Sequence, residues 1–281
     1  MQVWFQEEID PNQRFAYKVK DILFRGKSDF QTVDVIETEA YGKMLLIDGL
    51  VMITDKDEFV YHEMIAHIPA LNHKKPEKVV VIGGGDGGTV RELLKHPEVK
   101  EVVLCEIDSL VVEASKKYFP EVAGCLDDPR VKVNIGDGLA YMKNHTPNSL
   151  DLVIVDSTDP IGPGEGLFTK EFYASVARAL KEDGLMACQS ESPWYSEEIL
   201  KRIYNNVSGG FKNIAPYVGS VPTYPTGTWS WTLASNKELN VADFAKDRFE
   251  EIERKGLQYL SEGMMVGAFS IPKFHAEKLG I

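Results

Sequence analysis

Four acidic residues lie at or shortly after the ends of short apolar segments: Asp86, Glu106, Asp137 and Asp156. The segments read as parallel strands, whose carboxyl ends meet at one edge of a sheet, where ligands bind in a crevice. We therefore expect the four carboxylates to line one site. Carboxylates accept hydrogen bonds from hydroxyl and amino groups, and Asp86 would repel a phosphate. The set predicts an adenosine-type ligand without a pyrophosphate, which argues against NAD(P).

A glycine-rich turn carries the first of these carboxylates. Residues 79–88 read Val-Val-Val-Ile-Gly-Gly-Gly-Asp-Gly-Gly, so Gly83, Gly85 and Gly87 are spaced G-x-G-x-G. Without Cβ atoms, the backbone here can lie against a ligand at the end of the first strand. Taken alone, such a turn is a weak signal, because a plain tight loop has the same composition. Its setting between a strand and a helix favours the binding role.

The next two carboxylates suit the polar groups of adenosine. Glu106 lies about 20 residues beyond the glycine turn, where a carboxylate accepts hydrogen bonds from both ribose hydroxyls. Asp137, which is flanked by Gly136 and Gly138, is expected either to accept from an adenine amino group or to cap a turn or helix. Asp108 opens the following helical pattern, so we expect it to cap that helix.

Asp156 and Asp159 flank two small hydroxyl residues at the end of the fourth strand. One interpretation is a cap in a surface loop. The interpretation that we favour is a cation site at the active edge, in which a carboxylate also receives a proton. The Gly/Pro-rich residues 160–166 follow, and we expect them to form a mobile gate that orders over bound ligand and excludes water.

Elements of two kinds must position these residues, and they divide the chain at residue 58. Residues 1–58 alternate like strands, and Asp48-Gly49 between two apolar runs predicts a hairpin with a type I′ turn. Residues 59–281 alternate short apolar strands with helices, which indicates a doubly wound parallel α/β sheet. The expected strands are 78–82, 102–105, 131–135, 150–155 and 184–188, with 229–234 as an antiparallel strand, and the expected helices are 59–70, 89–95, 109–118 and 172–180.

Composition restricts the partners and the compartment. The 281 residues carry a formal net charge of -12, and an acidic protein repels phosphate backbones, so we expect no nucleic-acid partner. No stretch reaches the roughly 20 apolar residues of a membrane span, and the first residues show no signal-peptide pattern. The cysteines, Cys105, Cys125 and Cys188, are odd in number and scattered, which favours a reducing, cytoplasmic location.

A series of motifs resembles those of the spermidine synthases (polyamine aminopropyltransferases), and the resemblance runs almost end to end. The motifs are Tyr-Gly-Lys-Met-Leu-Leu-Ile-Asp-Gly from Tyr41, residues 57–64, the glycine turn, Cys105-Glu-Ile-Asp108, residues 156–163 and residues 221–227. That family transfers the aminopropyl group of decarboxylated S-adenosylmethionine to putrescine and releases spermidine, 5′-methylthioadenosine and a proton. The resemblance also implies a small N-terminal antiparallel β domain, a Rossmann-like core of the class I methyltransferase type, and a homodimer or homotetramer.

The resemblance also implies roles for individual residues. Asp156 would be the proton acceptor, and no metal or redox cofactor would be needed. The nucleoside and the rest of the donor would contact Gln31, Asp86, Glu106, Asp137, Gly138 and Pro163. The amine and the aminopropyl group would contact Tyr61, His62, Asp86, Asp156, Asp159 and Tyr224.

The chemistry of this transfer agrees with those roles. An amine displaces a neutral thioether from a methylene group bonded to a sulfonium, so carboxylates aimed at the nitrogen stabilise charge that develops in the transition state. An aspartate of pKa about 3.9 cannot efficiently deprotonate an alkylammonium of pKa about 10.4. We therefore expect Asp156 to bind and orient the amine and to take the proton as the new bond develops, with Tyr61 or a water assisting.

Alternatives remain for the substrate and for the class. Met265 and Met52 stand where relatives carry a histidine and a glutamine, so the amine is open among putrescine, cadaverine and a longer amine such as spermidine. An S-adenosylmethionine-dependent methyltransferase would usually place an acidic residue where this chain has Val81, and a non-enzymatic polyamine or nucleoside binder would not need the full carboxylate set. His62 and His67 resemble a zinc motif, but their spacing takes them off one helix face, so we expect no metal.

Overall fold

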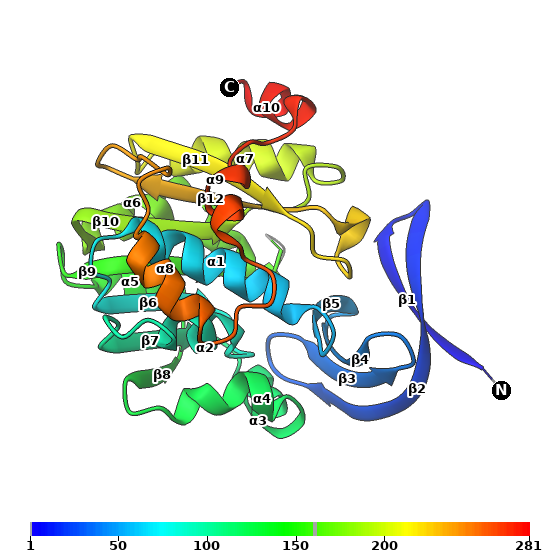
Figure 1. The fold of residues 1–281 in the computed structure, drawn as a ribbon. Coiled ribbons are helices and arrows are strands. Elements are labelled where there is room, and N and C mark those ends of the chain that lie inside the picture. Colours follow the sequence, from blue (N-terminus) through cyan, green and yellow to red (C-terminus); the bar gives the residue numbers. More distant parts are fainter. Residues whose placement is uncertain (1, 160–161) are drawn as a thin grey trace.

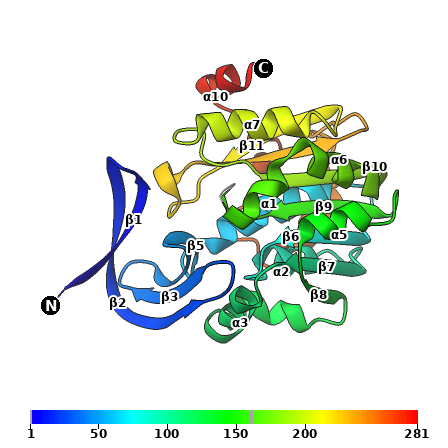
Figure 2. The ribbon, with the colours of Figure 1, turned by 180° about the vertical axis from the view of Figure 1, so that it is seen from behind.

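The computed structural model describes residues 2–159 and 162–281 and contains two sheets (Figure 1, Figure 2). The N-terminal sheet is antiparallel throughout, in the order β1-β2-β3-β4-β5. Its strands are β1 (Val3–Asp10), β2 (Gln13–Lys27), β3 (Thr32–Thr38), β4 (Gly42–Ile47) and β5 (Leu50–Thr54). Asp48 and Gly49 turn the chain from β4 to β5 with φ of 50° and 81°, which confirms the predicted hairpin.

The second sheet has seven strands in the order β11-β12-β10-β9-β6-β7-β8. The strands from β10 to β8 in this order run parallel, and β12 is antiparallel to both β10 and β11. The expected parallel sheet and the expected antiparallel strand near its end are thus confirmed. The strands are β6 (Lys78–Gly83), β7 (Glu101–Glu106), β8 (Val131–Ile135), β9 (Leu150–Asp156), β10 (Leu180–Gln189), β11 (Asn213–Gly219) and β12 (Trp229–Ser235).

Helices cover both faces of this sheet. Val79 and Val81 of β6 pack on one face with α1 and α2, and Val80 and Ile82 pack on the other face with α5 and α6. This doubly wound α/β arrangement beside an antiparallel sheet confirms the predicted fold class. The helices are α1 (Glu58–Asn72), α2 (Gly88–Leu94), α3 (Ser109–Tyr118), α4 (Pro120–Ala123), α5 (Gly138–Asn144), α6 (Lys170–Ala179), α7 (Glu197–Val207), α8 (Lys246–Glu253), α9 (Glu262–Gly267) and α10 (Lys273–Leu279), with 3-10 segments η1 (Gly124–Asp127), η2 (Gly162–Phe168) and η3 (Pro225–Gly227).

Several elements differ from the expectation. Strand β11 was not expected; it lies at the sheet edge and carries Pro216, and an edge strand tolerates a residue that cannot donate to the ladder. Leu180 opens β10 instead of ending the preceding helix. Helices α4, α5 and α7 to α10 were not expected either, although α7 buries Leu200, Ile203 and Val207 at the spacing of an amphipathic helix.

The N-terminal sheet packs against the α/β part through α3 and α4. Val33 and Ile53 of this sheet lie in one buried cluster with Val111 of α3. Asp57, between β5 and α1, accepts a hydrogen bond from the N–H of Thr223 at 2.8 Å. The division into residues 1–58 and 59–281 stays a prediction. Within the described residues, no helix is long and apolar enough to cross a membrane.

Candidate active site

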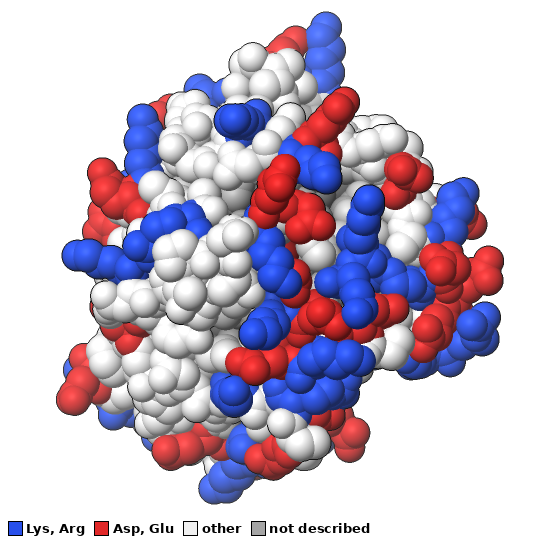
Figure 3. All heavy atoms as spheres, turned by 90° about the vertical axis from the view of Figure 1, so that its left-hand side faces the viewer, with Lys and Arg blue, Asp and Glu red and all other residues white. Residues whose placement is uncertain are grey.

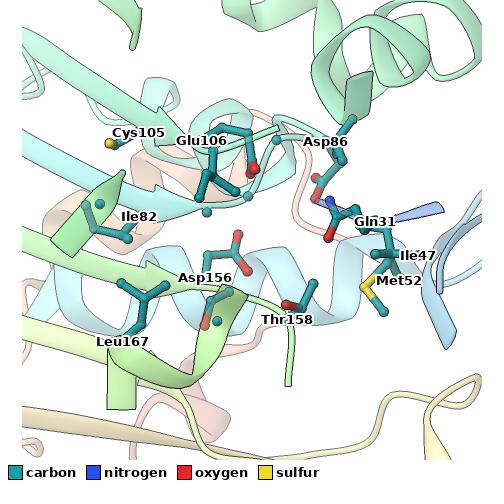
Figure 4. Close-up of a pocket in the computed structure, with 18 of the residues that line it drawn as sticks. Gln31, Ile47, Met52, Ile82, Asp86, Cys105, Glu106, Asp156, Thr158 and Leu167 are labelled. Carbon is teal, nitrogen blue, oxygen red and sulfur yellow. The ribbon is translucent and has the colours of Figure 1, made fainter. Parts of the chain in front are cut away.

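A first cavity lies at the carboxyl ends of β6, β7 and β9, where the strand order changes direction. Figure 4 shows Asp86, Glu106 and Asp156 around it, with Gln31 and Met52 on the side of the N-terminal sheet. A second cavity lies between β1 and the segment that follows β10. The two cavities meet, because they share the lining residues Met52, Tyr61, Ser157, Thr158 and Tyr224.

Predicted site residues line these two cavities. The first cavity is lined by Gln31, Tyr61, His62, Asp86, Glu106, Asp137, Gly138, Asp156 and Tyr224. Asp159 lines the second. Pro163 lies in η2, and its side chain is outside the described part of the chain, as are residues 160 and 161 of the expected gate. The structure therefore brings the described residues together, while the role of each stays a prediction.

Asp156 is held at the end of β9 by two hydroxyl groups. The Tyr61 hydroxyl donates to Oδ1 at 2.7 Å, and the Thr89 hydroxyl donates to Oδ2 at 2.6 Å. Burial, with the negative charge of Asp86, raises the pKa of Asp156. A carboxylate that is oriented by two donors and has a raised affinity for a proton suits a group that receives one during a reaction. Thr89 was not among the predicted site residues.

The glycine turn makes room for protein side chains. A Cβ on Gly84 would lie 2.6 Å from Oδ2 of Asp156, and a Cβ on Gly88 would lie 2.2 Å from the imidazole of His62. The sequence suggested that the glycine turn, with its G-x-G-x-G spacing at Gly83, Gly85 and Gly87, lets the backbone approach a ligand. At Gly84 and Gly88 the groups that approach most closely are Asp156 and His62, so the turn is glycine-rich partly because the site packs against it.

The imidazole of His62 lies between two carboxylates. Its Nδ1 is 2.6 Å from Oε2 of Glu58, its Nε2 is 3.1 Å from Oδ1 of Asp86, and the side chain is 1% exposed. Burial disfavours the charged ring, but Asp86 and Glu58 outweigh it and raise the pKa of His62 to about 10. Burial likewise opposes ionisation of Asp86, but the charge and hydrogen bond of His62, the N–H of Gly88 and the charge of Arg91 together outweigh it and lower the pKa of Asp86. His62 is therefore an imidazolium that keeps Asp86 ionised.

The two histidines of the zinc-like pair do not share a site. His67 lies 2.9 Å from both His96 and Glu92, measured between the nearest ring and carboxylate atoms, whereas His62 faces the first cavity. In the part of the chain that the structure describes, no group of three or more His, Cys, Asp or Glu side chains could hold a metal ion.

The carboxylates expected at the nucleoside have different surroundings. Oε1 of Glu106 accepts from the N–H of Asp108 at 2.9 Å, and burial raises the pKa of Glu106 to about 7. Asp108 caps α3, as expected. Asp137 accepts from the N–H of Leu139 at 2.8 Å and caps α5 while it also lines the cavity, so the two interpretations of this residue are compatible.

Six acidic residues line the second cavity: Glu7, Glu8, Asp159, Glu191, Glu197 and Glu198. Three of them, Glu7, Asp159 and Glu191, have raised pKa values. Glu7 reaches in from β1, and burial raises its pKa to about 7. Burial raises the pKa of both Asp159 and Glu191, and the charge of Asp159 raises that of Glu191 further. Neighbouring acids with raised pKa values favour an added cation, whose charge lets them ionise. Sequence reasoning missed Glu7 and Glu191, because neither lies in a local motif.

Two tyrosine rings form the junction of the cavities. The ring centroids of Tyr61 and Tyr224 are 5.8 Å apart. The Tyr224 hydroxyl donates to the carbonyl of Met52 at 2.7 Å, so its ring rather than its hydroxyl is available to a ligand. Aromatic faces attract cations. The junction therefore suits a short alkyl chain whose charged ends reach acidic groups on either side.

These features are those of an enzyme with the methyltransferase-like fold, whose two acidic cavities suit a nucleoside and a cationic substrate. The family model described as the spermine/spermidine synthase domain matches residues 58–275, and the spermidine synthase tetramerisation domain matches residues 3–55. The chain belongs to the spermine/spermidine synthase family.

The similarity to curated relatives and to solved structures extends over nearly the whole chain. The chain is 44% identical over 274 residues to a polyamine aminopropyltransferase of Bacillus mycoides (strain KBAB4), covering 98% of both chains. It is 46% identical over 278 residues to one of Thermoanaerobacter sp. (strain X514), covering 98% of this chain and 97% of the other. A crystal structure of a spermidine synthase in complex with the transition state analogue AdoDATO has a TM-score of 0.96 at 40% identity, covering 99% of this chain and 95% of the other. The spermidine synthase of Thermotoga maritima has a TM-score of 0.93 at 39% identity, with 99% and 94% covered. The chain is thus an enzyme of the aminopropyltransferase class.

Proposed function

We propose that the enzyme acts as a spermidine synthase, which transfers the aminopropyl group of decarboxylated S-adenosylmethionine to putrescine and releases 5′-methylthioadenosine and a proton. One observation carries the proposal. The carboxylate of Asp156, oriented by the hydroxyls of Tyr61 and Thr89, lies beside the junction at which the first cavity meets an acidic second cavity. The relatives named polyamine aminopropyltransferases and the neighbours named spermidine synthases support it.

The two cavities would divide the two substrates between them. The nucleoside would lie in the first cavity on Gln31, Glu106, Asp137, Gly138 and Pro163. The aminopropyl group would point toward the junction, with its ammonium on Asp86. Putrescine would enter through the second cavity, with its reacting nitrogen at Asp156 and its distal ammonium near Asp159 and Glu191. Each ammonium then meets a carboxylate, and the raised pKa values of Asp156 and Asp159 favour a positive charge beside these two acids.

The reaction is an in-line displacement. The putrescine nitrogen forms a bond to the methylene group next to the sulfonium, the carbon–sulfur bond breaks, and its electron pair leaves on 5′-methylthioadenosine as a neutral thioether. The nitrogen becomes cationic in the transition state, where Asp156 stabilises it and receives its proton. The sulfonium is already an activated leaving group, and the displacement requires no oxidant or reductant, so we propose that no metal or redox cofactor is needed.

We propose further that the enzyme is a cytoplasmic homo-oligomer, dimer or tetramer, without nucleic-acid or membrane partners. The three free cysteines suit a reducing compartment. The match of residues 3–55 to a tetramerisation domain supports self-association. The face shown in Figure 3 intersperses basic and acidic side chains, and the net charge of -12 repels phosphate backbones.

Asp86 is expected to distinguish the decarboxylated donor from S-adenosylmethionine, which carries an additional α-carboxylate. In the wild-type structure, the N–H of Gly88 donates to Oδ1 of Asp86 at 2.7 Å. Replacing Asp86 by Asn keeps an oxygen that can accept this hydrogen bond but removes the negative charge. We expect weaker binding of the decarboxylated donor, because its ammonium loses an ionic partner, and steady or tighter binding of S-adenosylmethionine, because a repulsion is removed. The measurement is the Michaelis constant of the first together with the inhibition constant of the second.

Binding of 5′-methylthioadenosine, which has neither charged group, is the control for this substitution. It should change little in the variant. Equal weakening of both charged donors would mean that Asp86 only shapes the loop.

The choice of amine is tested directly by incubating the enzyme and decarboxylated donor with putrescine, cadaverine and spermidine and identifying the products by mass spectrometry. We expect putrescine to give the highest kcat/KM, because the solved structures to which this chain is similar are named spermidine synthases. A clear preference for another amine would replace putrescine in the proposal, and the absence of any aminopropylated product would refute it.

A further inference from the structure

A row of interacting charged side chains runs from Asp86 away from the first cavity, between α1 and α2. His62 lies 3.1 Å from Asp86 through Nε2 and 2.6 Å from Glu58 through Nδ1. Glu58 in turn accepts two hydrogen bonds from Arg91, at 2.7 and 2.9 Å, in a bidentate pair. Such a pair fixes geometry as well as charge, because the guanidinium fork matches the carboxylate. Asp86 is thus joined to Arg91 through two intermediates.

The imidazole of His62 in this row has almost no freedom to move. It packs against the backbone of Gly88, where a Cβ would lie 2.2 Å from two ring atoms. The N–H of Gly88 donates to Asp86 at 2.7 Å, so the ring touches both the side chain of Asp86 and the turn that carries it. A shift of His62 would therefore displace Asp86.

Arg91 is itself anchored on its other side. Its Nε donates to Oε1 of Glu92 at 2.8 Å, and its side chain is 21% exposed. Arg91 and Glu58 are absent from the residues that line either cavity. Neither residue is therefore placed to touch a ligand, so an effect on substrate binding is indirect: it passes through His62, or through the charge of Arg91 acting on Asp86.

We propose that Arg91 and Glu58 are positioning residues of the donor site, which hold His62 against Asp86 so that Asp86 presents a fixed carboxylate to the ammonium of the aminopropyl group. This inference rests on the proposed function, because it assigns Asp86 to that ammonium. The arrangement has a physical reason. Asp86 and Asp156 are two like charges in one buried site, and a cation fixed behind Asp86 offsets their repulsion. Glu58 and Arg91 hold that cation in place.

The test replaces Glu58 by Gln and, separately, Arg91 by Met and by Lys. Calorimetry then measures the dissociation constants of decarboxylated S-adenosylmethionine and of 5′-methylthioadenosine. We expect the first two variants to bind the decarboxylated donor about tenfold more weakly, as for loss of one charge-assisted hydrogen bond. They should bind methylthioadenosine as wild type does, because it lacks the aminopropyl ammonium. Arg91→Lys should recover part of the affinity, because it keeps a cation near Glu58.

Lys95→Met is the matched control. Lys95 lies at the end of the same helix and pairs with Oε2 of Glu92 at 2.6 Å, so its loss perturbs the charges around α2 without touching Glu58. Its affinity for the decarboxylated donor should equal that of wild type. If thermal unfolding shows that Arg91→Met does not fold, the donor affinity of the nearly isosteric Glu58→Gln variant alone tests the positioning role.

Three results would overturn the inference: unchanged donor affinity in Glu58→Gln and Arg91→Met, equal weakening of donor and methylthioadenosine, or the same loss in Lys95→Met. An activity assay of the wild-type enzyme distinguishes failure of this inference from failure of the proposed function. If wild type forms spermidine but the variants bind the donor normally, only the positioning role is wrong.

Discussion

Replacing Asp156 by Asn is expected to lower kcat by a factor of about 10²–10⁴ while the binding of 5′-methylthioadenosine changes little. Asparagine is nearly isosteric and can still accept from the Tyr61 hydroxyl, which now donates to Oδ1 at 2.7 Å. It lacks the charge that stabilises the attacking nitrogen and cannot receive the proton. The nucleoside groups, Glu106 among them, are unchanged, so product binding should persist.

Asp151→Asn is the control for this substitution. Asp151 is also buried on β9, at its opposite end, where it accepts from the N–H groups of Glu77 and Lys78 and pairs with Lys181. Its replacement perturbs the same strand far from the cavities, so kcat should remain close to that of wild type. Retention of more than about a third of kcat in Asp156→Asn would contradict the role of Asp156, since general-base and electrostatic roles have far larger effects.

Glu106→Gln should weaken the binding of 5′-methylthioadenosine by about 10- to 100-fold. A carboxylate that accepts from two ribose hydroxyls makes charged hydrogen bonds worth about 1.5–3 kcal/mol, and each 1.4 kcal/mol corresponds to about a factor of ten. Glutamine keeps one acceptor for the N–H of Asp108, so the loop after β7 should hold its shape. Calorimetry measures the dissociation constant of 5′-methylthioadenosine. An unaltered value would show that Glu106 has a structural role and does not bind the nucleoside.

The same residue predicts a pH dependence of nucleoside binding. In the unliganded protein, burial raises the pKa of Glu106 to about 7. The ribose hydroxyls donate to the ionised form, so binding lowers that pKa and releases a proton. Affinity should therefore fall as the pH drops below about 7 and reach a plateau above it. Glu106→Gln should flatten this profile, and a wild-type profile that is already flat would show that Glu106 does not titrate with binding.

The sequence predicted those parts of the site that follow strand ends. Glu106 and Asp156 each end an apolar run, and parallel strands bring such ends to one edge, so local pattern and one topological rule were sufficient. Glu7 and Glu191 enter the site from β1 and from the segment after β10. The packing of the two sheets brings them together, and the spacing of residues along the sequence does not reveal that packing.

The supporting residues could be predicted only in part. Glu58 and His62 have the i,i+4 spacing of a helical pair, which the sequence does contain. The partner that fixes their role, Arg91, lies on another helix. Gly88 was expected in the turn but opens α2, and its contact with His62 depends on how α1 packs beside the start of α2. In both cases the residue type was visible in the sequence, and the contact was not.

The most direct test follows the transferred group. Decarboxylated S-adenosylmethionine with a deuterium-labelled aminopropyl chain is incubated with putrescine and the wild-type enzyme, and the products are identified by mass spectrometry. The proposed function requires that the label appear in spermidine, with one 5′-methylthioadenosine formed for each spermidine. A methylated amine, with the label left on the nucleoside, would instead show methyl transfer and contradict the account.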